Sequence, residues 1–175
     1  EIFFFGIVNF IFGYRALAAL SKWMLTIEFD EVCLSANCCS ELLDLFINNK
    51  QIKTHLLDIG MDRNTRLASL DEFLNDSKRP NRVLVVSVWS YGESPDIEQL
   101  HNLKSKYGFI LLEDRCLARP LITQEFNQLS DKTDAYLYST GYSKYCDLLY
   151  GGWILAKSNN ISYIGNDLSI DTDIM

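Results

Sequence analysis

Short apolar runs alternate with amphipathic stretches along most of this chain. The clearest run, Val83 to Val88, is continuously apolar and rich in β-branched residues, which predicts a central strand covered on both faces. Shorter apolar runs predict further strands at 32–34, 55–57, 109–112, 135–138 and 153–156. Apolar residues at helical spacing predict helices at 16–25, 42–47, 69–76 and 95–107. This alternation predicts an α/β protein whose sheet is mainly parallel, with helices on both faces.

Capping residues predict where several of these helices begin and end. We expect one helix to start near Ser40 and another to be capped by Ser69. In the segment Ser94-Pro95, serine is expected to cap the next helix and proline to fill its first position. Gly108 fits the end of that helix. The polar segments 60–66 and 119–132 are predicted to be surface loops.

The opening segment, 2–12, is strongly apolar. It is shorter than the roughly 20 residues of a membrane-spanning helix, and it lacks the basic flank of a signal peptide. We expect it to be a core or interface segment. The chain begins at Glu1 rather than at methionine, which is consistent with a fragment of a longer protein.

Composition narrows the function classes. A net charge of −7 argues against binding to nucleic acid or to anionic membrane surfaces, because proteins bind both through clustered Lys and Arg. Five cysteines, an odd number without metal-ligand spacing, favour a reducing cytoplasm over a disulfide framework. With only two histidines, the sequence offers no convincing zinc or iron site.

The candidate chemistry lies between the last two predicted strands. Ser139, Ser143 and Lys144 occupy a polar turn, and a glycine pair, Gly151-Gly152, precedes the final strand. A lysine in such a setting can form an imine with an aldehyde when its surroundings lower its pKa. Upstream, a buried-type strand ends in Asp114. Pyridoxal phosphate requires both an imine-forming lysine and an acid for its ring nitrogen. Taken in isolation, Lys144 would be interpreted as an ordinary surface lysine in a turn. The alternative for Asp114 is a solvated acid at a strand end or a helix cap.

These residues fall within an ordered set of motifs. The set runs Gly13-Tyr-Arg-Ala-Leu17, Phe29-Asp-Glu-Val-Cys-Leu-Ser35, Leu56-Leu-Asp-Ile59, Tyr91-Gly-Glu-Ser-Pro-Asp96, Ile110-Leu-Leu-Glu-Asp114, Tyr138-Ser-Thr-Gly-Tyr-Ser-Lys144 and Gly151-Gly152. In order and in separation it resembles the large domain of the DegT/DnrJ/EryC1/StrS aminotransferase family, which comprises fold-type I pyridoxal-phosphate enzymes. The resemblance covers almost the whole chain, so that 1–175 would be a partial cofactor-binding large domain without the family's N-terminal arm and C-terminal small domain.

The resemblance implies a role for each matching residue. Asp114 would pair with the ring nitrogen of pyridoxal 5'-phosphate, and Lys144 would form the imine and then carry a proton. Ser139 would contact the phosphate, beside a helix N-terminus at Gly13 and Tyr14. A capped helix and a polar turn are the alternative there.

Other matching residues keep two interpretations. The glycine pair permits either close backbone approach or a tight turn, and Tyr91 either borders the site or is a packed aromatic residue. Glu113 would face away from Asp114 on the strand and be structural.

Three positions depart from the family pattern. Tyr14 replaces a hydroxyl-bearing Ser or Thr, Cys39 replaces a ring-stacking residue, and Leu117 stands where a Gln or His would contact the cofactor. Each departure costs about 0.5–1.5 kcal/mol of cofactor binding if one contact is lost. They raise the prospect of a divergent or degenerate member.

The resemblance implies an aminotransferase that moves an amino group from an amino-acid donor, such as glutamate, to a nucleotide-linked keto-sugar. It further implies a cytoplasmic homodimer that functions in polysaccharide biosynthesis. The first alternative is a truncated or degenerate, non-catalytic domain with a structural or interaction role. A generic nucleotide-binding α/β domain is a weaker alternative, because no G-x-G-x-x-G follows the first strand.

Overall fold

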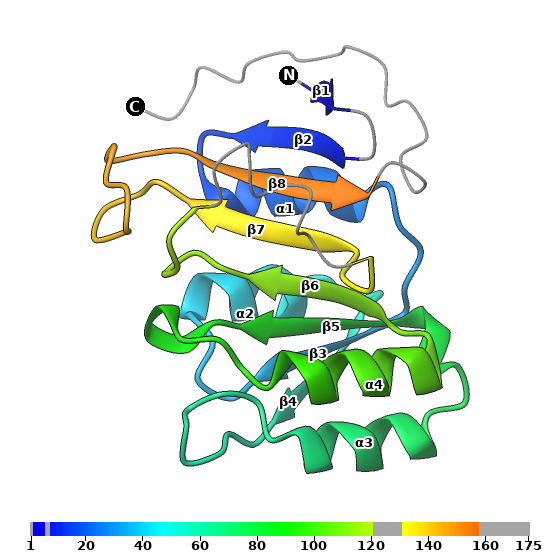
Figure 1. Ribbon diagram of the computed structural model, residues 1–175. Coiled ribbons are helices and arrows are strands. Elements are labelled where there is room, and N and C mark those ends of the chain that lie inside the picture. The colour runs from blue at the N-terminus through cyan, green and yellow to red at the C-terminus, as the bar shows by residue number, and fades with distance from the viewer. Residues whose placement is uncertain (1, 6–7, 121–130, 158–175) are drawn as a thin grey trace.

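One mixed sheet forms the centre of the molecule (Figure 1). The computed structural model describes residues 2–5, 8–120 and 131–157. The sheet has eight strands in the order β1-β2-β8-β7-β6-β5-β3-β4. Their bounds are β1 (Ile2–Phe5), β2 (Val8–Gly13), β3 (Glu31–Ser35), β4 (Lys53–Leu57), β5 (Val83–Val88), β6 (Ile110–Asp114), β7 (Ala135–Ser139) and β8 (Gly152–Lys157).

Strand directions divide the sheet into two parts. Strands β4, β3, β5, β6 and β7 are parallel to one another. Strand β8 runs antiparallel to β7, and β2 and β1 continue the antiparallel part to the edge. The apolar opening segment therefore forms edge strands, and Ile11 of β2 lies in the core as expected.

In the part of the chain that the structure describes, four α-helices cover the two faces of the sheet (Figure 1). Helices α1 (Ala16–Met24) and α2 (Ser40–Ile47) pack on one face, where Leu20, Trp23 and Phe46 are buried against the strands. Helices α3 (Leu67–Asp76) and α4 (Ile97–Tyr107) pack on the other face through Leu70, Leu74, Leu100 and Leu103. This confirms the predicted α/β class with a mainly parallel, doubly covered sheet. Within the described residues, every helix is too short or too polar to cross a membrane.

Two predicted helix caps were wrong. Helix α3 has Arg66 at its N-cap, and the amide of Ser69 already donates to the Arg66 carbonyl, so Ser69 belongs to the first turn. Helix α4 is capped by Asp96, whose Oδ1 accepts a hydrogen bond from the Gln99 amide at 3.0 Å. A carboxylate at this position both accepts the bond and favours the positive end of the helix, so it is preferred over the earlier serine.

Other local predictions were confirmed. Gly108 ends α4 in the left-handed conformation (φ 74°). Strand β5 has the predicted bounds, and its first five residues are buried. The loop at 60–66 is closed by the hydrogen bond from the Gly60 amide to the Asn64 carbonyl. Most of the predicted loop at 119–132 lies outside the described residues.

Candidate active site

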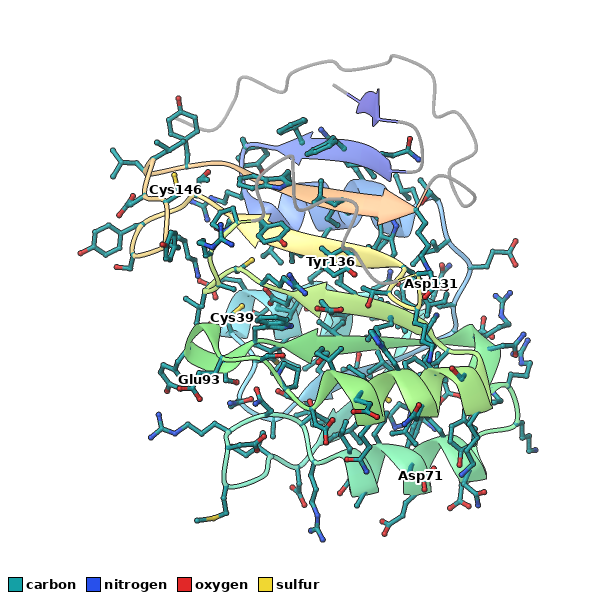
Figure 2. The ribbon with its side chains drawn as sticks, viewed as in Figure 1. Cys39, Asp71, Glu93, Asp131, Tyr136 and Cys146 are labelled. Atoms are coloured by element: carbon teal, nitrogen blue, oxygen red, sulfur yellow. The ribbon has the colours of Figure 1, made fainter. Side chains whose placement is uncertain are left out.

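A cavity of about 590 Å³ opens at the carboxyl ends of the parallel strands, which is where open α/β sheets bind ligands. Figure 1 shows this edge on the left, where the arrowheads of β5, β6 and β7 point. Its wall includes Asp114 from β6, Ser139 from β7, Lys144 from the following loop, and Cys39 at the start of α2, which Figure 2 labels. Segments far apart in the sequence thus converge on one cavity.

Asp114 is the last residue of β6 and is only 8% exposed. Its Oδ1 accepts a hydrogen bond from the Cys116 amide at 3.0 Å. Burial raises the pKa of the Asp114 carboxyl, while hydrogen bonds from Cys116 and the charge of Lys144 act to lower it. A buried carboxylate in this position favours a cationic ligand, because a bound positive charge would offset the loss of hydration.

Lys144 lies in the loop between β7 and β8 and also lines the cavity. Its amide donates to the Gly141 carbonyl at 3.2 Å, and the neighbouring Ser143 amide donates to Asp147 Oδ2 at 3.0 Å. Ser143 has positive φ (61°), a conformation that non-glycine residues adopt at a cost. The lysine is therefore held in a defined turn. Ser143 is not among the cavity-lining residues, whereas Ser139 is.

The glycine pair brings α1 onto β8. A Cβ on Gly152 would lie 2.5 Å from Ala16 Cα and 2.6 Å from the Ala16 nitrogen, too close for any side chain. The Gly151 amide donates to the Tyr14 carbonyl at 2.7 Å, and Gly151 has φ of +103°. Both interpretations of the pair therefore hold: Gly152 permits close backbone approach, and Gly151 makes the turn.

The residues at the start of α1 that line the cavity come later in the sequence than the pair we predicted. Arg15, Ala16 and Leu17 line the cavity, whereas Gly13 and Tyr14 are not among its lining residues. Gly13 is the last residue of β2, and the Tyr14 side chain is 70% exposed.

Cys39 and Leu117 line the cavity at two positions that depart from the family pattern. Cys116 lines it as well. Burial is the main cause that raises the pKa of the Cys39 and Cys116 thiols. At neutral pH both thiols are therefore uncharged, so they contribute contact surface rather than nucleophilic thiolates.

The interpretation of Tyr91 as a packed aromatic residue was wrong. Its side chain is 71% exposed, lines the cavity and lies under the Arg63 guanidinium, 4.9 Å from the ring centre. Sequence reasoning missed several other lining residues, among them Arg15, Asn37, Glu41, Trp89 and Ser90. Their only signal was position: each follows a strand or begins a helix at the same edge of the sheet.

Glu113 faces away from the cavity, as expected for its place on the strand. Its carboxylate is 1% exposed and accepts hydrogen bonds from Arg115, Trp89 Nε1 and Thr133 Oγ1. It is a structural group.

Among known proteins, solved structures share this fold, whereas sequence comparisons find no match. No family model matches the sequence, and no curated protein matches it. Solved structures do match. They include 3-amino-5-hydroxybenzoic acid (AHBA) synthase, with a TM-score of 0.70 at 16% identity over 88% of this chain. Helicobacter pylori PseC, an aminotransferase involved in the biosynthesis of pseudoaminic acid, gives a TM-score of 0.69 at 18% identity over 86% of this chain.

A third match is GDP-4-keto-6-deoxy-D-mannose-3-dehydratase from E. coli with bound hydrated PLP, with a TM-score of 0.65 at 19% identity over 87% of this chain. Each alignment covers 40% of the matched protein's own length. The chain therefore has the fold of the matched part of these proteins.

Proposed function

We propose that this chain is the cofactor-binding part of a pyridoxal-phosphate aminotransferase. The observation that carries the proposal is the convergence of the Lys144 amine and the Asp114 carboxylate on one cavity at the carboxyl end of the sheet. A lysine and a buried acid that share a cavity are the pair of groups this cofactor requires. The cofactor named for one structural neighbour, hydrated PLP, supports the assignment.

The residues of the cavity fit this cofactor. When bound, pyridoxal phosphate supplies an aldehyde and an electron-accepting ring. Asp114 would hold the protonated ring nitrogen, because its Oδ1 is already fixed by the Cys116 amide and its burial favours a cationic partner. Arg15 and the N-terminus of α1 would hold the phosphate together with Ser139, since unpaired helix amides and a guanidinium both attract anions. The volume of about 590 Å³ lies within the ordinary range of small-molecule sites.

Lys144 would have two tasks. Its amine would attach the cofactor, and after displacement by the amino donor it would move a proton to and from the reacting carbon. The turn at 141–147 would hold the amine near that carbon through its own hydrogen bonds. Cys39 and Tyr91 would bound the space that the ring occupies.

We propose a nucleotide-linked keto-sugar as the amino acceptor and an amino acid, such as glutamate, as the donor. The names of two structural neighbours support the sugar: one acts in pseudoaminic acid biosynthesis, and one is a dehydratase of a GDP-linked keto-sugar. The pathway class would be polysaccharide biosynthesis. Five free thiols fit a reducing, cytoplasmic setting.

A homodimer would complete the site. The loop that carries Lys144 exposes many large apolar side chains: Tyr142, Tyr145, Leu148, Leu149 and Tyr150. Apolar side chains gathered next to a cavity are typical of an interface. Because the chain spans 40% of the length of these neighbours, we propose that 1–175 is a partial large domain of a longer enzyme.

A second candidate is a non-catalytic member of this fold. Leu117 and Cys39 favour it, because they line the cavity where the resemblance predicts a polar and an aromatic residue. Both candidates keep the fold, but only the first binds the cofactor productively.

Covalent capture of the cofactor separates the two candidates. We expect the protein incubated with pyridoxal phosphate to turn yellow, and borohydride reduction followed by peptide mass spectrometry to find the adduct on Lys144. The variant Lys144→Ala should lose the adduct. Lys106→Ala, a change of an exposed lysine on α4, should keep it. A folded protein that forms no adduct, or forms it on another lysine, would refute the enzymatic proposal.

A further inference from the structure

Behind the cavity, β6 ends in Glu113 and Asp114, and Arg115 follows as the third charged residue of a run. Successive side chains of a strand point to opposite faces. Asp114 lines the cavity, whereas Glu113 and Arg115 contact each other on the opposite face: Arg115 Nε and Nη2 donate to Glu113 Oε2 at 3.0 and 2.8 Å. The Arg115 side chain is 14% exposed and the Glu113 side chain is 1% exposed. Only the cavity-facing member of the run has a role in the proposed function.

Arg115 is enclosed by aromatic residues from both neighbouring strands. Its guanidinium carbon lies 4.0 Å from the centre of the Trp89 ring and 4.7 Å from that of Tyr136, which Figure 2 labels on β7. Its Nη1 donates to the Tyr138 hydroxyl at 3.5 Å. Burial opposes the charge of Arg115, but Glu113 and Tyr138 outweigh burial and raise the pKa of the guanidinium. The arginine thus stays charged and ties the end of β6 to β7 and to the residue after β5.

This enclosure lies next to the peptide group that joins Asp114 to Arg115, which is held from both sides. The Trp89 amide donates to the Asp114 carbonyl at 2.9 Å, and the Arg115 amide donates to the Leu137 carbonyl at 2.8 Å. Trp89 itself lines the cavity, and its Nε1 donates to Glu113 at 3.1 Å. A movement of Arg115 would therefore be transmitted to Trp89 and to the backbone that carries Asp114.

We propose that Arg115 is a positioning residue that fixes the Asp114 carboxylate in the wall of the cavity. It acts by clamping the ends of β5, β6 and β7 together from the opposite face of the sheet. The value of that position for catalysis rests on the proposed function, but the clamp itself does not. With the clamp intact, Oδ1 of Asp114 stays on the Cys116 amide and the carboxylate keeps its place in the cavity wall.

The test is a titration of the Asp114 carboxyl in the cofactor-free protein, monitored by ¹³C NMR of labelled aspartate, with Asp114→Asn to assign the signal. Cys116 and Lys144 act on the Asp114 carboxyl, and the Cys38 and Cys39 thiols also interact with its charge. All four groups stay unchanged in every variant compared. In Arg115→Met we expect the raised pKa of Asp114 to move towards its ordinary value, because the loosened strand end admits water. Affinity for pyridoxal phosphate should fall about ten- to hundredfold, the equivalent of one misplaced hydrogen bond to a charged group.

Lys104→Met is the matched control. Lys104 forms an ion pair with Asp134 at the other end of the sheet, and its side chain is 16% exposed, close to that of Arg115. This variant also removes the cationic partner of a buried acid, but it should leave the Asp114 titration unchanged. If Arg115→Met does not fold, Arg115→Lys serves instead, because lysine keeps the charge and loses the planar stacking.

An Asp114 titration that stays the same in a folded Arg115 variant would overturn the clamp. A shift of equal size in Lys104→Met would overturn it too, since general loosening would then be the cause. Because the titration uses no cofactor, it gives an answer even if the protein proves unable to bind pyridoxal phosphate.

Discussion

The contact between α1 and β8 makes Gly152→Ala the sharpest stability test of this fold. The new methyl carbon would lie 2.5 Å from Ala16 Cα, 2.6 Å from the Ala16 nitrogen and 2.8 Å from the Tyr138 carbonyl oxygen. All three atoms belong to the backbone, so no side-chain rotation can relieve the contact. Either β8 or the start of α1 must move.

The size of the effect follows from this geometry. Forcing an extra methyl group into a packed site costs about 1–3 kcal/mol, and we expect the upper end because the obstruction is rigid on two sides. The lower entropy of the unfolded alanine variant returns about 0.4–1 kcal/mol. The net loss should be about 2–2.6 kcal/mol, which lowers Tm by roughly 4–10 °C in a protein of this size.

Urea denaturation followed by circular dichroism measures this loss directly. Gly141→Ala is the matched control, because its new methyl carbon would meet only Ser139 Oγ, at 3.5 Å, an ordinary contact. That variant should stay within about 0.5 kcal/mol of the parent. If Gly152→Ala loses less than about 1 kcal/mol, the close approach of α1 to β8 does not exist in solution and the cavity wall built on it must be redrawn.

Three further changes test the site and the core. Asp114→Asn should raise the free energy of unfolding at pH 7. Burial raises the folded pKa of this acid above its ordinary value of 3.8. The folded state therefore binds the proton more tightly, and it loses stability as pH rises between the unfolded and the folded pKa. Urea titrations should show the advantage of Asn shrinking as pH falls towards 3.8, and equal stability at pH 7 would contradict the burial argument. Leu117→Gln places a hydrogen-bonding amide on the cavity wall and should tighten pyridoxal-phosphate binding roughly two- to tenfold, measured by absorbance titration; unchanged or weaker binding counts against the proposed ring position. Trp23→Ala empties a fully buried site beneath α1 and should cost about 3–5 kcal/mol in denaturation experiments, whereas a loss below about 1 kcal/mol would mean that α1 is not packed as described.

The parallel half of the fold could be predicted from the sequence because its signals are local. The continuous β-branched run of β5 can be satisfied only by a strand buried on both faces. Helix caps were harder to predict. Ser94 and Asp96 both suit the start of a helix, and in the structure Asp96 is the N-cap of α4. The opening segment lacked the alternation of a one-sided strand, so its pairing at the sheet edge gave no local signal.

The residues that line the cavity also include some that could be predicted from the sequence and some that could not. Asp114, Ser139 and Lys144 could be proposed as site residues because they lie at the end of a recognisable strand or in the turn after one, and all three line the same cavity. Trp89 and Arg15 could not, because they reach the wall only through the packing of distant segments. The pairing of Glu113 with Arg115 had one available signal, namely that residues two apart at the end of a strand share a face.

The pairing of β2 with β8 has a consequence for how the protein is made. It joins residues 8–13 to residues 152–157, with nearly all of the described chain between them. Contacts of such long sequence separation form late, because the intervening chain must first be ordered. On the ribosome, β2 cannot pair with β8 until residues 152–157 have emerged, and its apolar surface is open to chaperones in the meantime. The start of α1, which packs on β8, would then be the last part of the cavity wall to form. The protein would therefore bind a ligand only once folding is complete.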